Sequence, residues 1–261
     1  MHASDSSPLR LGYTGTSGWS NAAWKPEFYP ATSRSAHWLE YYASQLSAIE
    51  LNASFYRAPT PGSIAKWVDG TPAPFRFAVK MWQGITHEAR LRDCEEQLFL
   101  CLKHYALFGE KRGPILFQLP PSLVYDAVLL KDFLALLPPN TQAVFEFRHA
   151  SWQRDETYQL LADAQASLCL SHMKKWTSPH LLTAPIAYVR LHGPQQWFKG
   201  EYDAPFIAEL GQWLNDSGAH TAYVFFNNTM TPAAPRNAQS MQLLLPQPYY
   251  PARGDLFSFA Q

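Results

Sequence analysis

The segment that decides the fold is AVFEFR, Ala143–Arg148, a short apolar strand that carries charges at its C-terminal end. An apolar strand buried on both faces is typical of a parallel sheet covered by helices. Charged groups are costly there unless they are paired or hydrated. In barrels and open α/β sheets, the carboxyl ends of parallel strands hold the functional site. The segment therefore predicts a helix-covered parallel sheet with Glu146 and Arg148 at its functional edge.

Five further segments repeat this pattern of an apolar run that ends in polar side chains. They are AIELN with Glu50 and Asn52, FAVK with Lys80, LFQL with Gln118, YVRLH with Arg190 and His192, and YVFFNN with Asn227 and Asn228. The segments LGYTGTSGW (11–19) and SLCLS (167–171) complete a set of eight strand candidates. These strands, with helices between them, predict a (β/α)₈ closed parallel barrel of the TIM type. A doubly wound open parallel sheet is the alternative.

The helices between these strands have recognisable start signals. Thr60 followed by Pro61 predicts a capped helix, and Asp126 and Asp155 each open a further helical pattern. Other helices are expected near residues 38–46, 92–108, 205–214 and 235–245, whereas residues 172–185 are too short and polar for one. No linker divides the chain, so we expect one domain over residues 1–261, with a Pro-rich tail from about residue 246.

Composition limits the classes of partner. The 21 basic and 21 acidic residues balance, which makes nucleic acid an unexpected partner without excluding a local basic cleft. We expect a cytoplasmic protein without a membrane segment, because no secretory signal and no apolar run near the ~20 residues of a membrane span is visible. Three cysteines, an odd number without a CxxC pair, indicate buried thiols in a reducing compartment.

Strand parity groups the polar residues, because alternate residues on a strand share a face. Glu50 pairs with Asn52, Glu146 with Arg148, and Arg190 with His192. If these faces turn inward, the residues form a ring at the barrel mouth, which Lys80, Gln118 and Asn227 would complete. The competing interpretation is that the ring consists of internally satisfied ion pairs with a purely structural role.

The ring predicts a catalytic group of Glu50, Glu146 and His192. Two carboxyls in different surroundings suit acid/base or glycosidase chemistry, in which one stays protonated while the other is ionised. Substrate contacts are expected from Asn52, Lys80, His87, Gln118, Arg148, Arg190, Asn227 and Trp19. The lysine and arginines suit a phosphate or carboxylate, and loop tryptophans suit a sugar. Glu50, Glu146 and His192 are a conceivable metal set, but no spacing requires one, and the sequence predicts no particular cofactor.

Nine segments together resemble the domain of unknown function 72 family, also called YecE-like. They are GTSGWS, FYP (28–30), IELNASFYR, FRFAVK, ITHEARLRD, GPILFQLPP, FEFRHASW, YVRLHGP and YVFFNNT with APRNA, which span residues 11–240 in order. The resemblance implies a TIM-barrel-like fold and no activity. One departure is that the family pattern after the sixth strand has an Asp following the Ser, where this chain has His172 after Ser171.

Three functional interpretations follow. The first is an enzyme that acts on an anionic or sugar-containing small molecule by acid/base or hydrolytic chemistry, with hydrolase as the candidate class. The second is a metal-dependent barrel that processes nucleic acid, as a repair nuclease does. The third is a non-catalytic protein that binds a metabolite or a partner. Oligomeric state is not indicated by the sequence.

Overall fold

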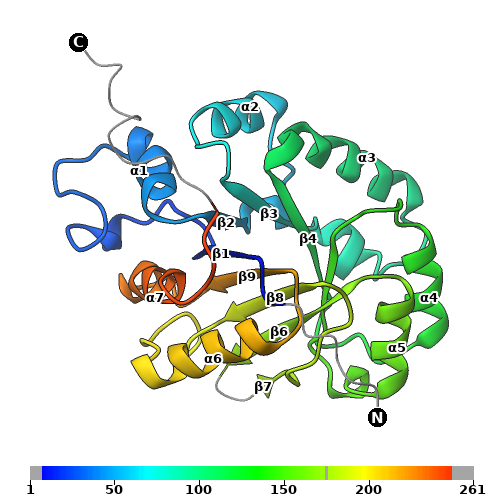
Figure 1. The fold of residues 1–261 in the computed structure, drawn as a ribbon. Helices are drawn as coiled ribbons and strands as arrows, with labels where there is room; N and C mark the ends of the chain where they lie inside the picture. The colour runs from blue at the N-terminus through cyan, green and yellow to red at the C-terminus, as the bar shows by residue number, and fades with distance from the viewer. Residues whose placement is uncertain (1–7, 174–175, 249–261) are drawn as a thin grey trace.

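Eight parallel strands form a nearly closed barrel in the computed structural model, which describes residues 8–173 and 176–248 (Figure 1). The strands are β1 (Leu11–Thr16), β2 (Ala48–Leu51), β3 (Arg76–Lys80), β4 (Arg112–Gln118), β5 (Ala143–Glu146), β6 (Ser167–Met173), β8 (Ile186–Leu191) and β9 (Thr221–Phe226). Their order is β1-β9-β8-β6-β5-β4-β3-β2, and the two-residue β7 (Trp176–Thr177) pairs antiparallel with β6. The predicted barrel is confirmed, and the open sheet is not the arrangement found.

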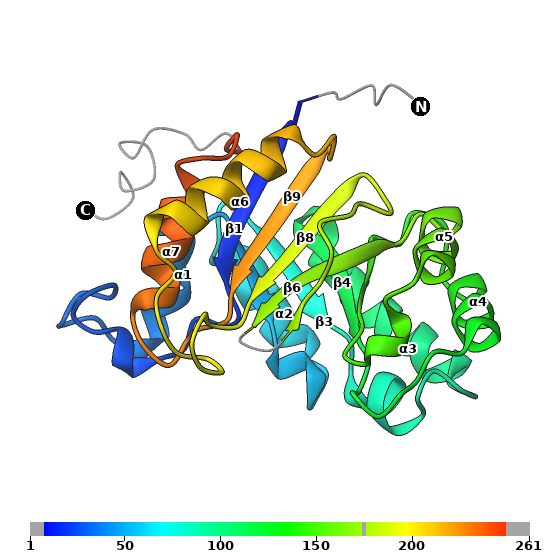
Figure 2. The same ribbon diagram turned by 90° about the horizontal axis from the view of Figure 1, so that it is seen from below.

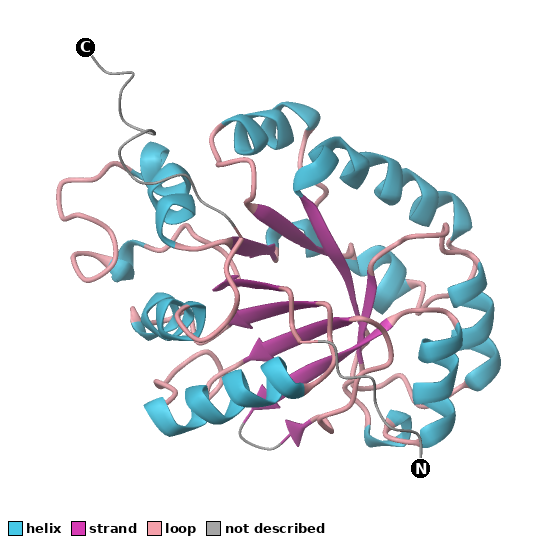
Figure 3. Ribbon diagram, viewed as in Figure 1, coloured by secondary structure: helices cyan, strands magenta, loops and turns pink. Residues whose placement is uncertain are grey.

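Helices surround the strands on the outside (Figure 3). They are α1 (Trp38–Gln45), α2 (Pro61–Asp69), α3 (Glu95–Tyr105), α4 (Ala127–Ala135), α5 (Asp155–Asp163), α6 (Ala204–Asp216) and α7 (Ala233–Gln242). The predicted caps are present at α2 and α4, where the side chains of Thr60 and Asp126 accept hydrogen bonds from backbone N–H groups of the first turn. Between β6 and β8 the chain forms the short β7 in place of a helix, as expected.

The barrel has a seam between β1 and β2, where side chains replace a backbone ladder. The Tyr42 hydroxyl accepts from the backbone N–H of Thr16 at 2.7 Å and donates to the carbonyl of Ala48 at 3.0 Å. The two strands approach so closely that a Cβ on Gly15 would lie 1.9 Å from the carbonyl oxygen of Ala48, so only glycine fits. A buried phenol from α1 therefore joins the two ends of the sheet.

The barrel interior is built in two layers. The apolar layer consists of Tyr13, Ala48, Ala78, Leu116, Val144, Cys169, Tyr188, Tyr223 and Phe225, all buried. Two residues further along five of these strands lies the charged layer, which consists of Glu50, Lys80, Gln118, Glu146 and Arg190. Figure 2 shows β1, β9, β8 and β6 side by side, so that equivalent positions on neighbouring strands lie at similar heights. The inward orientation expected from parity is confirmed.

Several expectations concern the chain as a whole. Cys94, Cys101 and Cys169 are buried free thiols. No helix in the described ranges is long and apolar enough to cross a bilayer. Most of the Pro-rich tail expected from about residue 246 lies outside the described residues, as do both ends of the domain predicted over residues 1–261.

Candidate functional site

A network of buried ion pairs crosses the barrel at the charged layer. Arg190, on β8, donates from Nε and Nη2 to the Glu50 carboxylate at 2.9 and 2.8 Å, and from Nη1 to Oε2 of Glu146. Glu50 also accepts from the hydroxyls of Tyr188 and Ser17, each at 2.7 Å. The side chains of Arg190, Glu50 and Glu146 are at most 1% exposed. One guanidinium therefore links carboxylates from two strands, β2 and β5, that are not neighbours in the barrel.

Both carboxylates of the network are ionised. Burial by itself would raise the pKa of Glu50, but the charge of Arg190 and three hydrogen-bond donors outweigh it and hold the pKa below its usual value. In the same way, Arg148 and Arg190 outweigh burial and hold the pKa of Glu146 well below its usual value. The expectation that one carboxyl stays protonated beside an ionised one is therefore wrong for this arrangement, because Arg190 pairs with both carboxylates and Arg148 pairs with Glu146 as well.

Glu146 is surrounded by two arginines, a glutamine and His192. Its Oε2 accepts from Gln118 Nε2 at 2.9 Å as well as from Arg190. Its Oε1 lies in ion-pair contact with Arg148 and 3.5 Å from His192 Nε2, yet it has no well-aligned hydrogen bond. Nε of Arg148 is likewise buried without a partner among the described residues. Within the described residues, Oε1 of Glu146 thus relies on its ion pair with Arg148, and the Nε–H of Arg148 is left without an acceptor.

His192 is a buried, neutral imidazole. Burial lowers its pKa to about 4, although Glu146 acts in the opposite direction. Nδ1 lies 2.9 Å from the Asn227 side-chain amide, and Nε2 lies 3.1 Å from Arg148 Nη2 and faces Glu146. Nε2 therefore lies between a donor, Arg148, and an acceptor, Glu146, a position in which the ring can take part in proton transfer.

Lys80 is a buried amine without a carboxylate partner. Its Nζ donates to Gln118 Oε1 at 2.8 Å and lies 3.9 Å from the ring centroid of Phe55. No Asp or Glu oxygen of the described residues lies within 4.0 Å of it. Burial, together with the nearby charge of Arg190, lowers its pKa to about 7, against the partial effect of the two glutamates. Lys80 therefore exchanges a proton close to neutral pH.

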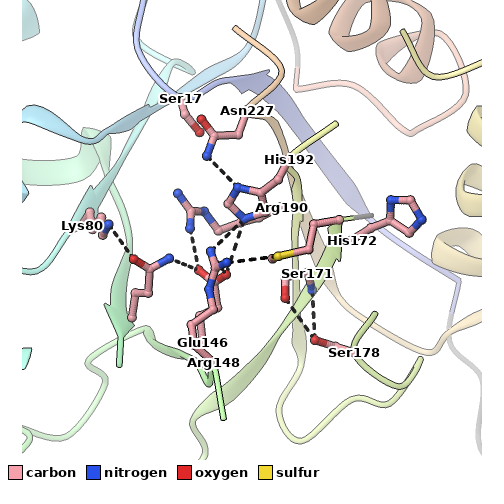
Figure 4. Close-up of polar contacts among 12 residues, drawn as sticks. Ser17, Lys80, Glu146, Arg148, Ser171, His172, Ser178, Arg190, His192 and Asn227 are labelled. Carbon is pink, nitrogen blue, oxygen red and sulfur yellow. Dashed lines mark hydrogen bonds and ion pairs between the residues drawn. The ribbon is translucent and has the colours of Figure 1, made fainter. Parts of the chain in front are cut away.

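A cavity of about 520 Å³ opens above these side chains at the C-terminal mouth of the barrel. Lys80, Arg148, Arg190, His192 and Asn227 line it, and Figure 4 shows the polar contacts of these side chains described above. Part of the cavity wall is aromatic and consists of Phe55, Trp197 and Phe198. The size and the mixed lining are those of a small-molecule site.

Eight of the predicted site residues line this cavity: Asn52, Lys80, His87, Gln118, Arg148, Arg190, His192 and Asn227. His87 reaches it from a π-helical turn (Gly84–Glu88), where burial lowers its pKa to about 4. Glu50 and Glu146 lie beneath the cavity and hold the arginines. Trp19 lines a neighbouring hollow of about 390 Å³, which shares Asn52 with the main cavity. The role of each residue in binding or catalysis stays a prediction.

Sequence reasoning did not select Tyr188, Ser17 or Phe55. Tyr188 lies two residues before Arg190 on the same strand face, so the parity argument could have found it. Ser17 and Phe55 come from loops after β1 and β2, where no periodicity indicates direction. His172, which stands where the family pattern has Asp, points away from the network and contacts the Tyr202 hydroxyl at 3.1 Å (Figure 4).

Comparison with known proteins places this chain in a family. Residues 13–253 match the family described as "Protein of unknown function DUF72". The chain belongs to the DUF72 family. This confirms the resemblance found in the sequence, and the family description assigns no activity.

Relatives of this DUF72 chain agree in sequence and in fold. It is 28% identical to the UPF0759 protein YunF of Bacillus subtilis (strain 168), over 94% of this chain and 99% of that protein. A DUF72 family protein of Thermotoga maritima MSB8 has a crystal structure with a TM-score of 0.82 and 26% identity, over 90% and 99% of the two chains. D-psicose 3-epimerase superposes with a TM-score of 0.59 at 11% identity, over 90% and 99%, which shows a shared barrel fold alone.

Proposed function

We propose that this DUF72 protein is an enzyme that binds a small anionic molecule in the cavity and transfers protons with Lys80 and His192. The observation that carries the proposal is the imbalance of charge at the cavity wall. Lys80, Arg148 and Arg190 face the cavity, whereas the two carboxylates of the network lie beneath it. An anion in the cavity would therefore meet cationic groups at short range, in a setting with limited screening.

The residues have separate roles in this proposal. Arg148 binds the anion, since Arg190 uses Nε, Nη1 and Nη2 in the network and is 1% exposed, whereas Arg148 lines the cavity and is 11% exposed. Lys80 acts as general acid and base near pH 7, and His192 exchanges a proton as a neutral imidazole. Glu50 and Glu146 hold Arg190 in position as ionised groups, so hydrolysis by a carboxyl pair with one protonated member gains no support.

One observation favours a non-catalytic protein that binds a metabolite as a second candidate. Both glutamates are paired with arginines, as in a network whose role is to shape the site rather than to react. For the metal-dependent nuclease there is no comparable observation. Across residues 8–173 and 176–248, no group of three or more His, Cys, Asp and Glu side chains is placed to hold a metal ion.

Ligand-dependent thermal unfolding tests the proposal. Inorganic phosphate, pyruvate and glycerol 3-phosphate, added separately at low ionic strength, should raise Tm of the protein because they bind only the folded state. Arg148→Gln should remove the shift for at least the ligand that gives the largest one. The matched control is Arg34→Gln, which removes an exposed arginine that does not line the cavity and should leave the shift unchanged.

Two results would decide against the proposal. Equal shifts in Arg148→Gln and in the control would show that anions bind elsewhere, and no shift with any of the three would contradict an anion site. A ligand could raise Tm and yet be left chemically unchanged by the protein. If a wider set of anionic metabolites gave the same result, the non-catalytic candidate would be favoured.

A further inference from the structure

We propose that Lys80 is a nucleophile that forms a Schiff base with an aldehyde or ketone carrying a carboxylate or phosphate group. This inference rests on the proposed function: it names the substrate class and gives Lys80 a nucleophilic role in place of proton transfer. A lysine serves in this way when its amine is desolvated or lies beside other cations, since both disfavour the ammonium form.

The surroundings of the amine meet both conditions. Lys80 is only 9% exposed, yet it lines the cavity, so a ligand reaches it while bulk water is largely kept away. The cations Arg190 and Arg148 both disfavour its charged form, Arg190 more strongly. The face of Phe55, 3.9 Å from Nζ, favours the ammonium. Burial is the larger influence, and the pKa is lowered to about 7.

Gln118 provides a second argument, because it occupies the place where a buried lysine would otherwise have a carboxylate. Its Nε2 donates to Glu146 at 2.9 Å, which turns Oε1 toward Lys80 at 2.8 Å. An amide oxygen can accept from an ammonium or from a neutral amine, and it favours the ammonium much less than a carboxylate at that distance would. The amide thus orients Nζ without fixing its charge.

The reaction requires no group beyond the two partners. The lone pair of the neutral Nζ forms a bond to the carbonyl carbon while the C=O π pair moves to oxygen, which takes up a proton released by the nitrogen. Loss of water from this adduct leaves a C=N bond, so amine and carbonyl compound give imine and water. Arg148 would hold the carboxylate or phosphate of the same molecule during both steps.

Trapping of the imine tests the inference. The protein would be treated with pyruvate and sodium cyanoborohydride at pH 7, and the modified lysines would be counted by peptide mass spectrometry. Lys80 should be modified at least tenfold more than Lys66 and Lys131, which are exposed and serve as internal controls. Propanal, a neutral carbonyl compound, would be used in parallel, and Lys80→Arg would remove the amine while it keeps the charge.

The outcomes separate the inference from the proposed function. Preference for Lys80 with pyruvate that falls in Arg148→Gln, while propanal labelling does not, supports the Schiff base and the anionic substrate class. Equal modification of Lys80 and Lys66 with both probes overturns the inference. The anion site is then tested separately by the Tm shift that phosphate produces. Preference for Lys80 with propanal alone overturns the anionic class. The comparison among lysines is made in the unaltered protein, so it holds even if a variant fails to fold.

Discussion

Ala78 and Lys80 lie two residues apart on the inward face of β3, as do Leu116 and Gln118 on β4. The first member of each pair packs in the apolar layer, where burial stabilises the barrel at roughly 25 cal/mol per Å². The second lies in the charged layer, where desolvation offsets most of what the ion pairs contribute. A step of two residues along the same strands thus separates a layer that stabilises the fold from a layer that adds little stability. The charged layer is therefore where a function is expected.

The largest expected effect comes from removal of the cation that the charged layer shares. Arg190→Met leaves Glu50 and Glu146 buried without their common partner and should lower the free energy of unfolding by about 3–5 kcal/mol in urea titrations. Arg34→Met, on the surface, should change it by less than about 0.5 kcal/mol. A loss below about 1 kcal/mol for Arg190→Met would mean that the carboxylates do not depend on it.

A substitution in the apolar layer should affect stability but not binding. Leu116→Ala removes a fully buried side chain and should cost about 3 kcal/mol, by loss of burial and by the cavity left behind. The Tm shift produced by phosphate should persist, since Leu116 does not line the cavity. Loss of that shift, in a variant that remains folded, would show that the two layers are not separable.

The pH dependence of stability should report on His192. Its pKa is lowered in the folded protein, so the unfolded chain binds more protons below about pH 6.5, and stability falls as the pH falls from 7 to 5. The contribution of His192 to this fall is about 2 kcal/mol. His192→Gln should flatten the curve by that amount, measured by urea titration at several pH values. His87 also has its pKa lowered to about 4, so some slope should remain. Identical slopes in the variant and the unaltered protein would contradict a neutral His192.

The smallest effect is expected at the seam. Tyr42→Phe removes the hydroxyl that accepts from Thr16 and donates to Ala48. The free energy of unfolding should fall by about 1–2 kcal/mol in the same assay. Phosphate binding should be unaffected, because the hydroxyl belongs to the barrel wall and not to the mouth. A variant as stable as the original would show that β1 and β2 stay joined without the phenol.

The barrel and most of the site could be predicted from the sequence because strand periodicity carries direction. Parity correctly grouped Glu146 with Arg148 and Arg190 with His192 on the inward face. Parity says nothing of which charges pair across the barrel, so it could not show that Arg190 joins Glu50 to Glu146 and keeps both ionised. The seam was equally hidden, since closure there depends on a side chain from α1 rather than on strand pattern.

Loops explain the remaining differences. Phe55, under the Lys80 amine, comes from a turn without periodicity, and Trp19 faces a neighbouring hollow rather than the main cavity. The lowered pKa of Lys80 depends on burial and on Arg190, which come from the assembled barrel. A pattern within one strand predicts where a side chain points, but not the charges that surround it.

Titration of Lys80 by nuclear magnetic resonance tests the account most directly. Protein carrying ¹³C at the ε position of lysine would be followed from pH 5 to 11, with Lys80→Arg to assign the signal. A midpoint near 7, well apart from the exposed lysines, is the predicted result, since the charged layer would then hold an amine that is reactive at neutral pH. A midpoint near 10.5 would contradict it, because Lys80 would then be a permanent cation and the charged layer only a scaffold.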